Sequence, residues 1–277
     1  MTGAKARLRQ AWDRQLSGTP GHIGVDLRSL DGPVLARDAD RQHYAASTIK
    51  LAVLATLLQS QVGAWPAVGI PVHSQFPSVA GGSFEVRMAD DQDDPTWSHQ
   101  GSELDLGRLA ERMITVSGNL ATDLILEYLG LDEVNRFLDR AGLGEAIAVD
   151  RLIGDDAAEA AGVTNRVSAD GLARLMAGIA DHSLLGEVAS RTALEVLARQ
   201  EHRRMIPAGL PPGTWSASKG GWVTGVAHDV ALVRPSAAPP YVLAICTTTG
   251  LDDTDGEALV ARLSAVTWEH WRTWHAW

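Results

Sequence analysis

Hydrophobic spacing gives the chain strand-like ends and a helical middle. Near the N-terminus, residues 22–27 and 33–37 read as two strands joined by Asp31-Gly32, a dipeptide typical of tight hairpin turns. Near the C-terminus three further strand-like runs follow one another at short spacing, over residues 215–219, 226–233 and 241–247. Runs this close together favour antiparallel pairing, so both ends of the chain are expected to meet in one sheet.

The middle of the chain, from residue 46 to about 200, is almost entirely helical in pattern. The exception is 65–99, which is rich in Gly, Pro, Ser and Asp and is expected to be mostly loop, with a short strand at 84–87. A last helix is expected over 253–277, opened by a capping box of Thr254 and Glu257.

These patterns predict an α+β protein with a discontinuous first lobe. Residues 1–45 and 203–277 would form a lobe built on the sheet, and residues 46–202 would form an inserted all-helical lobe.

The most apolar helix pattern opens with a possible nucleophile and base. Ser47 stands at its N-terminal end and Lys50 lies three residues later, so both side chains emerge on one face. Burial lowers the pKa of a lysine, and a neutral Lys50 could take the proton of Ser47. Ser47 as a helix cap followed by a solvated lysine is the alternative interpretation.

Two later segments favour the catalytic interpretation. Ser117-Gly118-Asn119 follows a predicted amphipathic helix, and Lys219-Gly220-Gly221 lies in a strand-like run. S-x-x-K, then S-D-N, then K-T-G, in that order, is the signature of class A β-lactamases and penicillin-binding proteins. From about residue 20 to its end, the chain resembles that family. The resemblance implies a five-stranded antiparallel sheet flanked by terminal helices, with the active site in the cleft beside the helical lobe.

The resemblance also implies a role for each motif residue. Ser47 would be the acylated nucleophile and Lys50 its proton-transfer partner. Ser117 would pass a proton to the leaving nitrogen, and Lys219 would hold Ser117 and the substrate carboxylate. Asn119, Gly220 and Gly221 would contact substrate, and the backbone N–H groups of Ser47 and Trp222 would form the oxyanion hole. Taken singly, Ser117, Asn119 and Lys219 also fit a turn, a helix cap and a solvated strand residue.

The chain departs from the family pattern at three positions. Gly118 replaces a mainly structural aspartate, and Gly220 replaces a hydroxyl residue that donates to a substrate carboxylate. Ile153 stands where class A β-lactamases carry the glutamate that activates the deacylating water, and an isoleucine cannot move a proton. Asp155 is the best candidate for a displaced base, although a solvated loop charge is the simpler interpretation. Asp229 would bind substrate or pair with Lys219.

The composition of the chain limits which binding partners and which cellular location are expected. The 277 residues carry a formal net charge of −10, which disfavours nucleic acid and anionic membranes as partners. The histidines lack the spacing of a metal site, no cofactor is expected, and Cys246 is the only cysteine. No apolar run follows the basic residues near the N-terminus, so a cytoplasmic monomer acting on a small molecule is expected, or an exported one if the native protein carries a leader.

The sequence therefore predicts a serine acyl-enzyme hydrolase. Its substrate would be a β-lactam or a related amide or ester, opened through an acyl-Ser47 intermediate with slow deacylation because of Ile153. A D-Ala-D-Ala peptidase or esterase of the penicillin-binding type shares the same motifs. A non-catalytic ligand-binding relative is the alternative from a different class.

Overall fold

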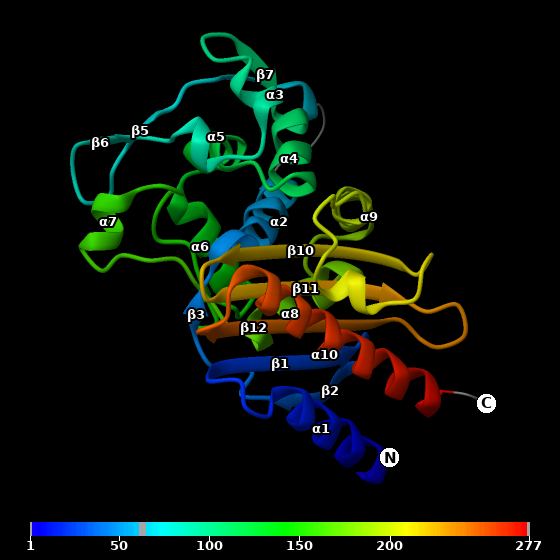
Figure 1. Ribbon diagram of the computed structural model, residues 1–277. Coiled ribbons are helices and arrows are strands. Elements are labelled where there is room, and N and C mark those ends of the chain that lie inside the picture. Colours follow the sequence, from blue (N-terminus) through cyan, green and yellow to red (C-terminus); the bar gives the residue numbers. More distant parts are fainter. Residues whose placement is uncertain (1, 61–64, 276–277) are drawn as a thin grey trace.

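A five-stranded antiparallel sheet organises the molecule, in the order β10-β11-β12-β1-β2 (Figure 1). The computed structural model describes residues 2–60 and 65–275. The strands of this sheet are β1 Gly21–Ser29, β2 Gly32–Arg37, β10 Trp215–Val223, β11 Val226–Arg234 and β12 Tyr241–Thr249. Because β1 pairs with β12 over its whole length, the two ends of the chain meet in one sheet. The predicted α+β class with its five-stranded antiparallel sheet is confirmed.

The terminal helices cover one face of the sheet. These helices are α1 Thr2–Leu16 and α10 Asp253–Trp274 (Figure 1). Trp12 is buried between them, and its indole Nε1 donates to Thr267 Oγ1 at 2.9 Å. The predicted capping box at Thr254 is wrong, because Asp252 caps α10 by accepting from the N–H of Asp255 at 2.9 Å.

The other face of the sheet is covered by α8, and the remaining helices lie around and beyond the edge strand β10 (Figure 1). The strands β11 and β12 are buried along nearly their whole length because both faces of the sheet are covered. The longer helices between β2 and β10 are α2 Lys50–Ser60, α4 Leu106–Thr115, α5 Asn119–Leu129, α6 Leu131–Arg140, α8 Ala169–Ala180 and α9 Glu187–Ala198. The lobe boundaries placed at residues 45/46 and 202/203 stay a prediction.

Short elements connect these helices. The shorter helices are α3 Asp94–Trp97 and α7 Asp156–Ala160, with the 3₁₀ turns η1 Ala46–Ile49, η2 Trp65–Ala67, η3 Met88–Asp90 and η4 Ile206–Gly209. The short strands are β3 His43–Tyr44, β4 Gly69–Pro71, β5 Gln75–Pro77, β6 Ser83–Glu85, β7 Glu103–Asp105, β8 Ile147–Ala148 and β9 Arg166–Val167. The strand predicted at 84–87 is found as β6 at Ser83–Glu85, where it pairs with β5 in a two-stranded ribbon.

Candidate active site

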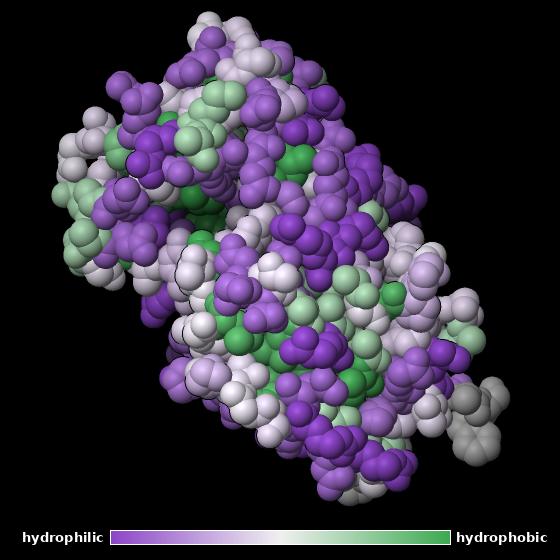
Figure 2. Space-filling model, viewed as in Figure 1, coloured by the Kyte–Doolittle hydropathy of each residue, from purple (hydrophilic) through white to green (hydrophobic). Residues whose placement is uncertain are grey.

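Ser47 lies in the 3₁₀ turn that leads directly into α2. It lines a cavity of about 110 Å³ together with Asn119, Ile153 and Trp222. Figure 2 shows the molecule hollowed between the region of α7 and the adjacent end of the sheet, with hydrophobic surface inside the hollow. Within the described part of the chain, the Ser47 hydroxyl makes no hydrogen bond. It is therefore available to a molecule that enters the cavity.

Lys50 is fully buried at the first position of α2 and has three oxygen partners. Its Nζ donates to the carbonyl of Ser117 at 2.7 Å, to Asn119 Oδ1 at 2.8 Å and to Ser117 Oγ at 3.2 Å. Burial lowers the pKa of Lys50 from 10.5 to about 7, against the opposing effect of nearby carboxylates. Near pH 7 the neutral form of the amine is therefore accessible, and a general base must be in its neutral form to accept a proton.

Ser117 follows α4 with a backbone φ of +62°, a left-handed conformation that is uncommon for residues with a side chain. Its Oγ accepts from Lys50 and from Lys219, whose Nζ lies 3.0 Å away on β10. Burial and the charge of Lys50 hold the pKa of Lys219 well below its ordinary value. Since both lone pairs of the Ser117 oxygen are engaged, its own proton is directed elsewhere.

Gly221 lets β10 pass close to the Ser47 turn. A Cβ at residue 221 would lie 2.6 Å from the backbone N of Ser47 and 2.9 Å from that of Thr48. Trp222, the next residue of β10, lines the same cavity. The two residues predicted to supply the oxyanion-hole N–H groups therefore line one cavity.

The Asp229 side chain, and the direction that a side chain at residue 220 would take, both lie away from that cavity. They are cross-strand partners, and a Cβ at residue 220 would lie 2.5 Å from Met205 Cε and 3.7 Å from Asp229 Oδ1. Asp229 accepts from the N–H of Ile206 at 2.9 Å, and burial raises its pKa to about 7. Lys219 donates to Ser117 and to the carbonyl of Gly220, so the expected Lys219–Asp229 pair is not formed.

Ile153 lines the cavity, whereas Asp155 does not. The Asp155 carboxylate is fully buried and accepts from Ser78 Oγ at 2.8 Å, from the N–H of Val79 at 3.1 Å and from the N–H of Ala158 at 3.0 Å. It caps α7 and ties that helix to a neighbouring loop. The expectation that Asp155 is a displaced base is not supported by this geometry.

Three acidic residues of the site were missed by sequence reasoning. Asp123 lies one turn after Asn119 on α5 and holds the Ile153 loop, because its Oδ1 accepts from the N–H of Ile153 at 2.8 Å. Burial raises the pKa of Asp123 well above its usual range. A carboxylate inside the apolar run of α5 was a readable signal. Asp91 and Asp93 contact α5 and α4 from a loop and carried no local signal.

The described part of the chain shows neither a cluster of metal-binding side chains nor a helix that could span a membrane. Within residues 2–60 and 65–275, no three His, Cys, Asp or Glu side chains are grouped to hold a metal ion. None of the helices in these ranges is long and apolar enough to cross a bilayer.

Together, the fold and the buried Lys50–Ser117–Lys219 arrangement beside Ser47 define a serine hydrolase. A family model described as the beta-lactamase enzyme family, Beta-lactamase2, matches residues 82–271, a span that includes Ser117 and Lys219 but begins after Ser47. Because the match covers more than half of the chain, the protein belongs to the beta-lactamase enzyme family. A search of curated proteins finds no match.

Solved structures of similar fold extend over nearly the whole chain. PBP-A is 24% identical with a TM-score of 0.80 over 96% of each chain. A class A beta-lactamase from Mycobacterium abscessus is 18% identical with a TM-score of 0.79, over 96% of this chain and 98% of its own. A beta lactamase from Xanthomonas campestris is 19% identical with a TM-score of 0.79, over 95% and 97%. At these identities the similarity shows the fold alone.

Proposed function

We propose that this protein opens β-lactams through a covalent acyl-Ser47 intermediate and releases the product slowly. The observation that carries the proposal is the contact of two buried lysines, Lys50 and Lys219, with the single hydroxyl of Ser117 beside the Ser47 cavity. Burial of two amines around one oxygen makes it costly for both to be charged at once, and such arrangements are typical of sites that need shifted pKa values.

In the acylation step, Ser47 Oγ attacks the lactam carbonyl and loses its proton to neutral Lys50. The carbonyl of Ser117 and Asn119 Oδ1 accept two N–H bonds of Lys50. The third contact is a hydroxyl, which can either donate or accept, so the site accommodates both the neutral and the protonated amine. The backbone N–H groups of Ser47 and Trp222 would stabilise the oxyanion.

Cleavage of the lactam C–N bond needs a proton on the leaving nitrogen. Ser117 can supply it, because its oxygen accepts from Lys50 and Lys219 and its own proton remains free to donate. Protonated Lys50, 3.2 Å from Ser117 Oγ, would then restore that proton. The two lysines thus serve one proton relay from Ser47 to the leaving group.

Deacylation lacks an evident base. Ile153 faces the cavity, and Asp155 is engaged as a helix cap. General-base assistance is commonly worth about 10²–10⁴ in rate, and its absence favours a long-lived adduct. A leucine-to-glutamate variant of PBP-A, in a chain 24% identical with a TM-score of 0.79, was solved as an acyl-enzyme complex with penicillin G.

The test is incubation with a fluorescent penicillin, followed by intact-protein and peptide mass spectrometry. We expect one adduct on Ser47, a burst of nitrocefin opening and then a slow steady state, with neither in Ser47→Ala. Absence of label, together with no hydrolysis of nitrocefin or simple esters, would contradict the proposal.

A D-Ala-D-Ala peptidase or esterase activity is the second candidate, and Ile153 favours it because slow release of penicillin is typical of penicillin-binding enzymes. Turnover of D-alanyl-D-alanine peptides faster than nitrocefin would decide for it, and localisation of the native protein would show whether it meets such substrates. A non-catalytic relative would instead bind ligand reversibly, with an affinity unchanged by Ser47→Ala.

A further inference from the structure

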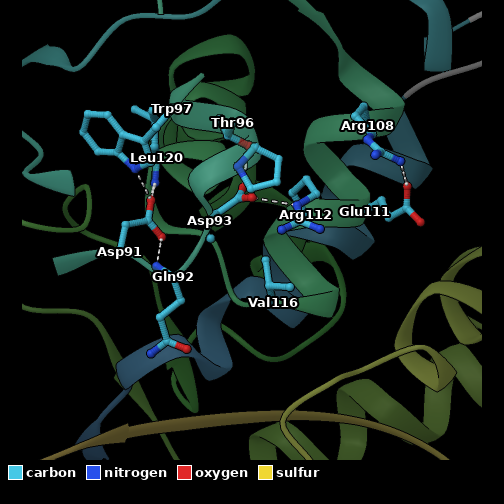
Figure 3. A network of polar contacts seen from close by, with 12 residues as sticks. Asp91, Gln92, Asp93, Thr96, Trp97, Arg108, Glu111, Arg112, Val116 and Leu120 are labelled. Carbon is cyan, nitrogen blue, oxygen red and sulfur yellow. Dashed lines mark hydrogen bonds and ion pairs between the residues drawn. The ribbon is translucent and has the colours of Figure 1, made fainter. Parts of the chain in front are cut away.

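The loop that contains η3 and α3 approaches the second motif at the point where the motif lacks a side chain. We infer that Asp91 and Asp93 of this loop together replace the carboxylate missing at Gly118 and so position Ser117 and Asn119 for acylation. The inference rests on the proposed function, because positioning is measured as a rate of Ser47 acylation. Figure 3 shows the two carboxylates on either side of Gln92, turned toward different partners.

Asp93 occupies the space that a side chain at residue 118 would need. A Cβ on Gly118 would lie 2.7 Å from Asp93 Oδ2 and 3.0 Å from its Cβ. The Asp93 carboxylate is fully buried, pairs with Arg112 Nε of α4 at 2.6 Å and accepts from Thr96 Oγ1 (Figure 3). A charge buried this deeply is retained only with such partners, and here they fix the end of α4 that leads into Ser117.

Asp91 caps α5 from outside the helix. Gly118 stands at the N-cap position and has no side chain to cap with. Asp91 replaces it, because one of its oxygens accepts from the N–H of Asn119 at 2.9 Å. The other oxygen accepts from the N–H of Leu120 at 2.9 Å and from the indole of Trp97 at 3.0 Å (Figure 3). The first turn of α5 is therefore held by a residue 28 positions earlier in the chain.

The same loop fixes the side chain of Asn119. Its Nδ2 donates to the carbonyl of Asp90 at 2.8 Å, while its Oδ1 accepts from Lys50 at 2.8 Å. Asn119 is thus held by the loop through its backbone and its amide, and it passes that constraint to the amine of Lys50. A small displacement of these groups should slow acylation, because proton transfer depends steeply on geometry.

The carboxylates also act on Lys50 through charge. Burial lowers the pKa of Lys50, and three carboxylates raise it. Asp91 has the largest of these raising effects, followed by Asp123 of α5 and then Asp93. Lys219 of β10 also donates to the Ser117 hydroxyl. Removal of the Asp91 charge should therefore make Lys50 easier to deprotonate and move the acidic limb of the acylation profile to lower pH.

Exchange of the two positions is the direct test. Asp93→Ala and Gly118→Asp should each slow penicillin acylation by about 10- to 100-fold. The first removes the carboxylate, and the second places two carboxylates in one space. The double variant, which moves the carboxylate into the motif, should recover most of the rate. A double variant no faster than the product of the two single effects would overturn the inference. If Asp93→Ala alone does not fold, the double variant is compared with Gly118→Asp alone, because recovery of the rate still requires the space that the Asp93 carboxylate leaves.

The pH profile separates positioning from general stability. Asp91→Asn should slow acylation at pH 8 and shift its acidic limb downward, whereas Asp94→Asn, which alters an exposed carboxylate of the same loop, should do neither. An Asp91→Asn enzyme with lower thermal stability but an unchanged rate and profile would show a merely structural role and overturn the inference. If the wild type forms no Ser47 adduct, the proposed function itself fails, which is a distinguishable result.

Discussion

Lys50 Nζ contacts Ser117 twice, through its carbonyl oxygen at 2.7 Å and its hydroxyl at 3.2 Å. Both contacts require the left-handed backbone of Ser117, which turns its carbonyl and its side chain toward the same buried amine. A residue with a side chain pays a conformational cost of roughly 1 kcal/mol for this backbone. The strain coincides with the point where the nucleophile's base and the proton donor meet, as is common at functional sites.

Comparison of Ser117→Gly with Ser117→Ala should separate strain from chemistry. Both variants lack the hydroxyl, and both should acylate about 10²–10⁴-fold more slowly than the wild type if Ser117 transfers the proton. Gly should nevertheless be more stable than Ala by about 1 kcal/mol, because only glycine adopts a φ of +62° without strain. Chemical denaturation and stopped-flow acylation measure the two effects.

Ile153→Glu should shorten the lifetime of the acyl-enzyme. A carboxylate at this wall of the cavity can hold and deprotonate water, which is worth about 10²–10⁴ in deacylation rate. The adduct is followed by intact-protein mass spectrometry after excess penicillin is removed, and Ile153→Gln is the matched control without a base. Equal lifetimes for the glutamate and glutamine variants would contradict the role assigned to this position.

Asp155→Asn should leave the adduct lifetime unchanged. Because Asp155 caps α7 and accepts from Ser78 and Val79, the substitution should lower stability by about 1 kcal/mol or more without an effect on deacylation. Rapid penicillin turnover in the wild type, with a stalled acyl-enzyme in Asp155→Asn, would instead identify Asp155 as the base.

Acylation should rise with pH through a midpoint near 7. Burial lowers the pKa of Lys50 from 10.5 to about 7, so the amine is protonated and inactive below this pH and neutral above it. The rate should therefore fall about tenfold per pH unit below the midpoint and level off above it. Stopped-flow acylation from pH 5 to 9 checks this, and a midpoint near 10 would show that Lys50 stays charged.

Alanine substitutions at two adjacent glycines should have unequal effects. The methyl group of Gly221→Ala would press on the backbone of the Ser47 turn, so acylation should fall by about 100-fold or more. The methyl group of Gly220→Ala meets the flexible end of Met205, which can move aside, so the rate should change little. Similar losses for both variants would argue against the close approach of β10 to Ser47.

Local sequence patterns determined most of the helices and strands and the residues of the three motifs. The hairpin between β1 and β2, the two-residue period of the strands and the apolar helix after Ser47 each depend on neighbouring residues, so these elements could be predicted from the sequence. The turn itself is made by Leu30 and Asp31 rather than by Asp31 and Gly32, because Gly32 already pairs with Ser29 in the sheet. The three motifs also gave the residues that the structure gathers around Ser117. Their order along the chain matched a known family, whereas the 3₁₀ turn at Ser47 and the left-handed backbone of Ser117 set the directions of those two side chains.

Contacts between distant segments were decided only by the tertiary structure. Asp91 and Asp93 support the second motif from a loop without regular pattern, and Asp155 reads as a loop charge until Ser78 is seen beside it. Asp252 rather than Thr254 caps α10, because the choice depends on backbone angles that several polar residues could satisfy. A carboxylate binds whichever N–H groups folding brings to it. Its role is therefore set by packing, which the order of residues along the chain does not reveal.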